Sequence, residues 1–215
     1  MKNYKNLTLT FILTLFLVSC SSNEIVNLRT AKDIVKDYYE TGRFDLEMNE
    51  VINIAKEKFN RVDFTANSVV IFDVDETALN NYGLAKQMDF GYVYDLNKKW
   101  NNELKAPAIK QVKDLYDYLL SKNIKIIFLT GRNFEEYDVT YKNLVQEGYK
   151  SFDTLITQRA DEQKLKALDF KSKKRAELTS KGYEIIGTVG DQWTDLNGEY
   201  SGIQIKVPNY LYEIK

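Results

Sequence analysis

The sequence predicts an α/β fold in which a mostly parallel sheet is flanked by helices. Short apolar runs rich in β-branched residues alternate along the chain with longer segments of helical periodicity. The first two runs, 68–72 and 124–129, are apolar at nearly every position. Strands that are buried on both faces of a parallel sheet have this composition.

Two helices are expected before the first strand. Residues 24–41 place apolar side chains at helical spacing, and Gly42 ends the run. A second amphipathic stretch follows, so we assign N-terminal helices to 24–62. The first strand then covers 68–72.

The segment after the first strand, about 80–106, is irregular, polar and rich in rings. We interpret it as a small cap-like insertion. Its rings either stack on a bound aromatic group or form the small core of the insertion, and we favour the second interpretation, with one or two rings also touching a ligand. The rings are Tyr82, Phe90, Tyr92, Tyr94 and Trp100.

The remaining elements alternate regularly. Pro107 is expected at the first position of the next helix, where its missing N–H costs nothing. The strand over 124–129 follows. Further elements are expected as a helix over 134–147, a strand over 154–157, a Lys-rich helix over about 172–180, a strand over 184–189 and a strand over 202–207.

The N-terminus carries the signs of a targeting segment. Lys2 and Lys5 precede the apolar run Leu7–Val18. This run suits a secretory signal and is shorter than the ~20 residues that span a membrane. The run ends in LVSC, which resembles a bacterial lipobox with Cys20 as the lipidated residue.

We therefore expect a lipoprotein signal peptide over 1–19 and a single domain over 20–215. The protein would be exported and lipid-anchored through Cys20 to a bacterial membrane, at the outer membrane or at the periplasmic or extracellular face. An ordinary signal peptide that happens to contain a cysteine is the alternative.

The composition excludes several kinds of chemistry. The 215 residues include no histidine, which removes every mechanism and metal site that uses an imidazole. Cys20 is the only cysteine, so the chain can form no internal disulfide. Thirty basic residues against 31 acidic ones leave no overall field to attract a nucleic-acid polymer. Any catalysis must use carboxylates, lysine, tyrosine, hydroxyls or a hard metal ion.

Polar side chains follow the predicted strands at the edge where ligands of such sheets bind. Clustered carboxylates repel one another unless a cation joins them, and oxygen ligands select a hard ion such as Mg²⁺. The chemistry suggested is phosphoryl transfer, with Asp73 as nucleophile and Asp75 moving the proton. The strand-end residues are Asp73, Asp75, Glu76, Thr130, Arg132, Asp191 and Asp195, joined by Lys171 just before the Lys-rich helix.

Four segments, FDVDET, FLTGR, FKSKKR and GDQWTDL, resemble in order the four motifs of the haloacid dehalogenase-like (HAD) phosphohydrolases. The segment GDQWTDLNGEYSGIQIKVPNYLYEI is similar to the acid phosphatases of HAD subfamily IIIB. That group holds the class B-like and class C bacterial enzymes and the plant vegetative storage proteins. The resemblance covers about residues 25–215 and implies a Rossmann-like HAD fold with a small cap.

The resemblance also implies roles for individual residues. Asp73 would be the nucleophile and Asp75 the acid/base. Lys171 is preferred over the nearby Lys173 and Lys174, because the family pattern has Lys-Ser followed shortly by Arg. The implied Mg²⁺ residues are Asp73, Asp75 through its backbone carbonyl, Asp191 and, directly or through water, Asp195. The implied phosphate-binding residues are Thr130, Gly131, Arg132 and Lys171.

The expected function is a Mg²⁺-dependent acid phosphatase that hydrolyses small phosphomonoesters, nucleotides among them, through a phospho-aspartate. The alternative is a non-catalytic binding or storage lipoprotein on the same scaffold, against which the presence of Asp73 argues. A phospho-receiver domain is a weaker alternative, because it needs no acid/base two residues after the nucleophile. Glu76 is expected to be structural. The substrate, the pH optimum and the oligomeric state are left open.

Overall fold

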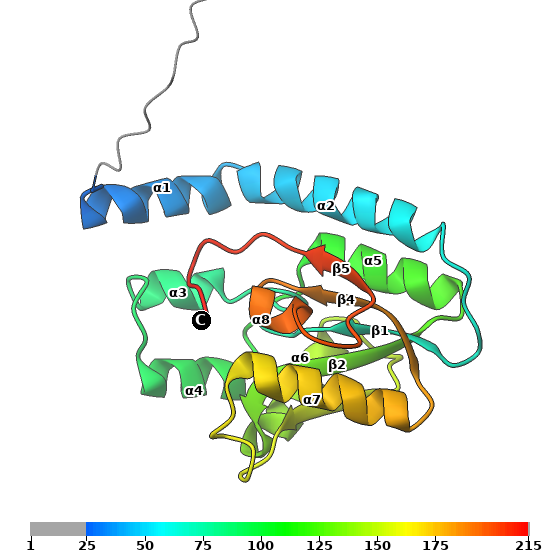
Figure 1. Cartoon of the computed structure of the whole chain (residues 1–215). Coiled ribbons are helices and arrows are strands. Elements are labelled where there is room, and N and C mark those ends of the chain that lie inside the picture. Colours follow the sequence, from blue (N-terminus) through cyan, green and yellow to red (C-terminus); the bar gives the residue numbers. More distant parts are fainter. Residues whose placement is uncertain (1–24, 215) are drawn as a thin grey trace, which may run out of the picture.

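The computed structural model describes residues 25–214 and contains one five-stranded sheet (Figure 1). The sheet has the order β3-β2-β1-β4-β5, and every neighbouring pair is parallel. The predicted signal peptide and Cys20 lie outside the described residues. The strands are β1 (Ser68–Phe72), β2 (Lys125–Asn133), β3 (Thr154–Gln158), β4 (Glu184–Gly190) and β5 (Ile203–Lys206). The predicted α/β class with a parallel sheet is confirmed.

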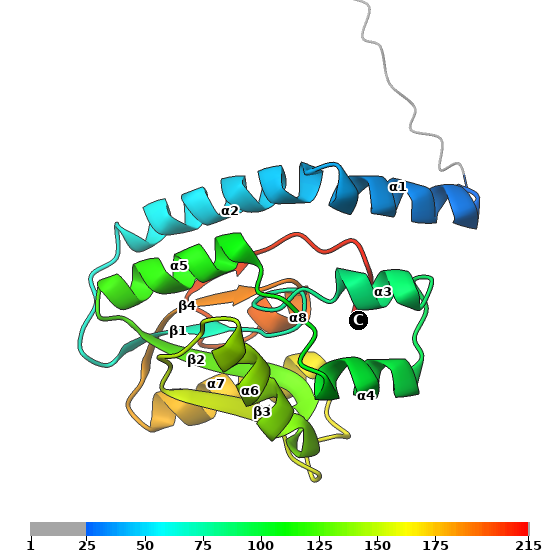
Figure 2. The ribbon, with the colours of Figure 1, turned by 180° about the vertical axis from the view of Figure 1, so that it is seen from behind.

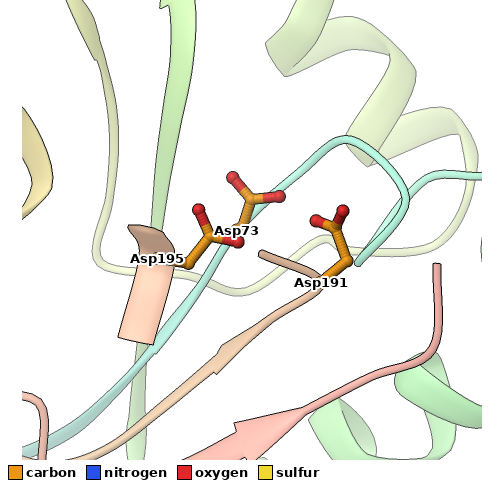
Figure 3. Close-up of side chains that lie close together, drawn as sticks. All are labelled: Asp73, Asp191 and Asp195. Atoms are coloured by element: carbon orange, nitrogen blue, oxygen red, sulfur yellow. The ribbon is translucent and has the colours of Figure 1, made fainter. Parts of the chain in front are cut away.

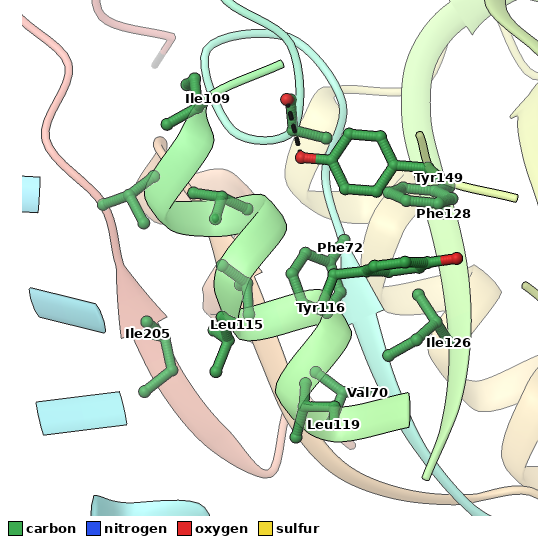
Figure 4. Close-up of a cluster of buried hydrophobic side chains, with 14 of the residues drawn as sticks. Val70, Phe72, Ile109, Leu115, Tyr116, Leu119, Ile126, Phe128, Tyr149 and Ile205 are labelled. Atoms are coloured by element: carbon green, nitrogen blue, oxygen red, sulfur yellow. Dashed lines mark hydrogen bonds between the residues drawn. The ribbon is translucent and has the colours of Figure 1, made fainter. Parts of the chain in front are cut away.

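Helices cover both faces of the sheet. All five residues of β1 are buried. Because strand side chains alternate between faces, the four apolar ones divide between two apolar clusters. Val70 and Phe72 join the larger cluster with α2 (Arg43–Phe59), α5 (Lys110–Ser121) and α6 (Tyr137–Gln146). Figure 4 shows part of this cluster between α5 and the strands.

The opposite face is covered by one long helix. Val69 and Ile71 pack there with Phe170 and Leu178 of α7 (Ala167–Ser180). The view from behind in Figure 2 shows α5 and α6 in front of the sheet, whereas α7 lies on the side seen in Figure 1. The strand at the centre of the sheet is therefore shielded from water on both sides, and its carboxyl end is the point from which functional side chains can leave.

The cap-like insertion is more regular than predicted. It forms two short helices, α3 (Tyr82–Gln87) and α4 (Tyr94–Asn102). The ring edge of Trp100 in α4 approaches Gly83 so closely that a Cβ on this glycine would lie 2.9 Å from the ring atom Cη2. The close approach explains why a segment that looks irregular in sequence can pack as a helix pair.

The expected start of a helix at Pro107 is wrong, because α5 begins at Lys110. The residues before α5 are bonded to the chain that leaves β1. The carbonyl of Pro107 accepts from Asn80 N at 2.8 Å, and Ile109 N donates to Ala78 O at 3.0 Å. The two ends of the insertion are thereby tied together before the helix can begin.

Three further boundaries differ from the prediction. The strand expected over 124–129 continues as β2 to Asn133, with irregular pairing to β3 after Leu129. Lys171 lies inside α7, not before it, because the first turn of this helix is anchored by the buried side chain of Phe170. The helix expected over 134–147 is a 3₁₀ turn, η1 (Phe134–Glu136), followed by α6.

The N-terminal helix α1 (Leu28–Glu40) has no buried residue. It continues α2 along one side of the molecule and reaches the insertion (Figure 1). Lys32 pairs with Asp89 at 2.6 Å, and Glu40 pairs with Lys86 at 2.6 Å. Across residues 25–214, no helix is long and apolar enough to cross a membrane.

Arg175 fixes the chain that follows β4. This fully buried side chain of α7 donates to the backbone carbonyls of Asp195 at 2.6 Å, Glu199 at 2.9 Å and Asn197. The short helix α8 (Trp193–Leu196) and the turn behind it are therefore held by one guanidinium group.

Replacing Arg175 by methionine is expected to lower the free energy of unfolding by about 3 kcal/mol, because three carbonyls lose a charged donor. Lys173→Met is the matched control, since it removes a positive charge from the same helix at a half-exposed site and should cost less than about 1 kcal/mol. Urea denaturation followed by far-UV circular dichroism measures both. Equal losses for the two variants would contradict the role of Arg175.

Candidate active site

A cavity of about 680 Å³ opens at the carboxyl ends of the strands. The fold brings all the residues predicted for catalysis, metal binding and phosphate binding to its wall, although they lie in α7, α8 and β2 and in the turns that follow β1 and β4. The predicted residues that line the cavity are Asp73, Asp75, Thr130, Gly131, Arg132, Lys171, Asp191 and Asp195.

Asp73 and Lys171 form a buried ion pair at the floor of the cavity. The ammonium group of Lys171 donates to Asp73 Oδ1 at 2.5 Å and to Asp195 Oδ1 at 2.6 Å. Burial disfavours the charged lysine, but the two carboxylates outweigh it and raise the pKa of Lys171. The two ion pairs therefore favour the charged form of Lys171. The neighbouring Lys174 instead pairs with the buried Glu162 at 2.6 Å, which supports the choice of Lys171.

Three aspartates converge beside this lysine. Oxygen atoms of Asp73, Asp191 and Asp195 all lie within 4.8 Å of one another, and each residue is buried (Figure 3). Burial is the first cause that raises the pKa of Asp73 well above its ordinary value, and repulsion by Asp195 and Asp191 adds to it against the attraction of Lys171. Burial and Asp195 likewise raise the pKa of Asp191. The cluster carries more negative charge than its one lysine neutralises.

Neighbouring groups hold Asp191 and Asp195 in place. Asp191 Oδ1 accepts from Thr77 at 3.0 Å, and its Oδ2 accepts from the side-chain amides of Gln192 at 2.6 Å and Asn209 at 2.7 Å. Asp195 packs closely against the end of β4. A Cβ added to Gly190 would lie only 2.5 Å from the Cβ of Asp195. A glycine at this position is therefore a condition for bringing Asp195 to the cluster.

Asp75 is held in a different environment. Arg132 binds it in a bidentate manner, with Nη2 at 2.6 Å from Oδ1 and Nε at 2.9 Å from Oδ2. The side-chain amide of Asn81 adds a third hydrogen bond at 2.8 Å. Burial favours the neutral carboxyl, but the charge and hydrogen bonds of Arg132 outweigh burial and lower the pKa of Asp75. Arg132, expected at the substrate, is thus engaged with the predicted acid/base.

Thr130 lines the cavity, and its hydroxyl already makes one hydrogen bond within the chain. Its side chain is 1% exposed, and Oγ1 accepts from the backbone N–H of Arg132 at 3.1 Å. A hydroxyl that accepts from one group still carries a proton to donate to another. Gly131, beside it on the cavity wall, adds no side chain there.

Glu76 and Tyr212 line the cavity but were not predicted to act in it. Glu76 is buried, has a left-handed backbone with φ 55°, and accepts from Asn81 N at 3.0 Å and from the Tyr212 hydroxyl. Burial and the carboxylates of Asp75 and Asp191 raise the pKa of Glu76 to about 8. The motif resemblance extended through Tyr212, but nothing in its spacing indicated a contact with the turn after β1.

The five rings of the insertion divide among three environments. Phe90 and Tyr92 line the cavity. Tyr82 instead stacks on Tyr39 with ring centroids 4.6 Å apart, and Trp100 donates to Asn81 at 3.0 Å. Tyr94 is 62% exposed. Two of the five rings therefore serve packing, two face the cavity and one is largely exposed.

Comparisons with known proteins agree with the motifs. A family model described as HAD superfamily, subfamily IIIB (Acid phosphatase) matches residues 12–215. Acid phosphatase 1 of Solanum lycopersicum is 34% identical over 188 residues, which are 85% of this chain and 74% of that protein. The stem 31 kDa glycoprotein of Glycine max is 32% identical over 215 residues, covering 92% of this chain and 84% of that protein.

One similar protein is named as a storage protein. Vegetative storage protein 2 of Arabidopsis thaliana is 31% identical over 85% of this chain and 71% of that protein. Among solved structures, the class C acid phosphatase from Bacillus anthracis with tungstate bound has a TM-score of 0.70 at 21% identity, covering 86% of this chain and 85% of that one. This likeness supports the HAD fold. The chain belongs to the acid phosphatases of HAD subfamily IIIB and is a phosphomonoesterase.

Proposed function

We propose that this acid phosphatase hydrolyses small phosphomonoesters through a phospho-aspartate on Asp73, with Mg²⁺ as its cofactor. The observation that carries the proposal is the buried cluster of Asp73, Asp191 and Asp195 around Lys171, beside the Asp75–Arg132 pair. A carboxylate for attack and another for proton transfer face the same cavity.

The residues present fit a divalent cation. Three buried carboxylates around a single ammonium group leave negative charge that burial makes costly. Their ligand atoms are all oxygens, which favours a hard ion such as Mg²⁺. Asp73, Asp191 and the backbone carbonyl of Asp75 would hold it, and Asp195 would bind directly or through water. The ion would supply charge neutralisation and polarise a phosphoryl oxygen.

In the first step, a carboxylate oxygen of Asp73 attacks phosphorus and the ester P–O bond breaks. The leaving oxygen takes a proton from Asp75. Lys171 and the hydroxyl of Thr130 bind the phosphoryl oxygens, where negative charge is concentrated in the transition state. Because Arg132 lowers the pKa of Asp75, a lower pH is needed to populate the protonated form of this carboxyl.

In the second step, water attacks the phosphoryl group on Asp73 and gives a proton to Asp75. The bond between Asp73 and phosphorus breaks, and phosphate leaves. Asp73 is then free as a carboxylate, and Asp75 has regained the proton that it lost, so the cycle closes.

The cavity favours a small leaving group with both polar and apolar parts. The lining includes the polar Asn97, Asn101 and Glu136, whereas Leu84 and Phe90 contribute apolar surface. At about 680 Å³ the cavity suits a small monoester, and nucleotides are among the candidates.

Export and a lipid anchor at Cys20 are part of the proposal and rest on the sequence before residue 25. The alternative function is a binding or storage lipoprotein on this scaffold. The Arabidopsis relative named as a storage protein makes this alternative concrete. The retention of Asp73, Asp75, Lys171 and Asp191 in one cavity favours catalysis.

Replacing Asp73 by asparagine is expected to lower kcat for a chromogenic phosphomonoester by at least about 10³-fold, because the amide is a poor nucleophile. Asp138→Asn, at an exposed aspartate of α6 outside the cavity, is the control and should keep full activity. Acid quenching of the wild type during turnover should yield a phosphorylated peptide that contains Asp73. Full activity of Asp73→Asn would refute the nucleophile.

The metal assignment predicts that EDTA abolishes activity and that Mg²⁺ restores it. Asp191→Asn should raise the Mg²⁺ concentration needed for half-maximal activity by roughly tenfold or more, because a charged ligand is lost. The metal titration of each protein measures this. Wild-type activity that survives EDTA, or an unchanged titration for Asp191→Asn, would count against the metal site. A wild-type protein that is inactive with every monoester tested would favour the storage alternative.

A further inference from the structure

We propose that the C-terminal segment, residues 209–214, is a positioning element of the active site that holds Asp191 and the catalytic turn after β1 in their working geometry. The inference rests on the proposed function in so far as Asp191 binds the metal ion. It assigns a task to Asn209, Tyr212 and Glu76, none of which the mechanism above uses.

The path of the segment brings it across the open edge of the site. Val207 N still donates to Gly190 O at 3.0 Å, so the chain leaves β5 beside the end of β4. It then runs beneath α1 and ends near α3, as the red trace in Figure 1 shows. Outside the site it is held by Tyr210, whose ring lies 4.7 Å from that of Tyr38.

The first contact is with a predicted metal ligand. The amide of Asn209 donates to Asp191 Oδ2 at 2.7 Å, while its own Oδ1 accepts from Leu211 N at 2.8 Å. The second bond fixes which way the amide faces, so the N–H group is presented to the carboxylate. Partners of this kind orient a metal ligand and maintain its charge.

The second contact passes through Gln192. Its amide nitrogen donates to Asp191 Oδ2 at 2.6 Å and to the carbonyl of Tyr212 at 3.3 Å, and its oxygen accepts from Ile214 N at 3.0 Å. Both ends of this side chain are thus bonded to the C-terminal segment. The orientation of the second donor on Asp191 therefore also depends on the segment.

The third contact reaches the turn after β1. The Tyr212 hydroxyl donates to Glu76 Oε2, and Glu76 Oε1 accepts from Asn81 N at 3.0 Å. Asn81 in turn donates from its side chain to Asp75 Oδ1 at 2.8 Å. Glu76 adopts φ 55°, a conformation that costs a non-glycine residue about 1 kcal/mol or more and needs support from its surroundings.

These contacts join two carboxylates that arrive on different strands. Asp191 follows β4 and Asp75 follows β1, and the segment bonds to the neighbours of both. A displacement of the segment would loosen the donors on Asp191 and the turn that carries Asp75 together. Glu76, which has no chemical step to perform, acquires a role as the residue that receives the segment.

The test compares two variants with a matched control in the full chain. Asn209→Ala should weaken Mg²⁺ binding, measured by isothermal titration calorimetry, roughly tenfold or more. Tyr212→Phe removes one oxygen atom and should lower kcat several-fold, with a smaller effect on KM. Tyr210→Phe removes a hydroxyl of the same segment that bonds Glu47 at 3.3 Å, and it should leave both quantities unchanged.

Thermal unfolding of each variant separates positioning from folding. The inference requires losses in Mg²⁺ affinity and kcat while the unfolding transition stays within a few degrees of the wild type. Wild-type Mg²⁺ affinity in Asn209→Ala together with wild-type kcat in Tyr212→Phe would overturn it. Absence of Mg²⁺ binding by the wild type would instead refute the metal assignment of the proposed function.

Discussion

The architecture of this site depends on one electrostatic problem, the burial of several carboxylates at the end of the central strand. Oxygen atoms of Asp73, Asp191 and Asp195 lie within 4.8 Å of one another, and Lys171 neutralises only part of their charge. Isolated buried charges of this kind would cost several kcal/mol each in a protein interior. The fold tolerates them because each carboxylate is hydrogen-bonded in place and because the cavity gives a cation access to them.

Holding like charges together requires rigid support from residues that do no chemistry. Arg175 fixes the turn around Asp195, and Gly190 provides the space that lets this aspartate reach the cluster. Thr77 and Gln192 hold Asp191 from two sides. Each of these contacts joins parts of the chain far apart in sequence or lies in a turn where no periodic pattern exists, so the support of the site is a property of the fold rather than of a motif.

This distinction explains how much the sequence could predict. The strands, their parallel arrangement and the residues at their carboxyl ends follow from apolar runs that stop at Asp73, near Thr130 and at Asp191, because local composition specifies a buried strand. The start of α5 could not be predicted from Pro107, because the preceding residues bond to the chain after β1. Contacts such as Tyr212 with Glu76 depend on long-range packing, which no spacing in the sequence encodes.

The environments of the two motif aspartates sharpen the proposed mechanism. Its first step requires an ionised Asp73 and a protonated Asp75, yet burial and like charges raise the pKa of Asp73, whereas Arg132 overcomes burial and lowers that of Asp75. Binding of a divalent cation would reverse the first shift by offsetting the repulsion among the carboxylates. A phosphoryl group would compete with Asp75 for Arg132 and so weaken the interaction that keeps Asp75 charged. In the proposed mechanism, cation binding would thus favour the ionised Asp73 that attacks, and substrate binding would favour the protonated Asp75 that gives up its proton.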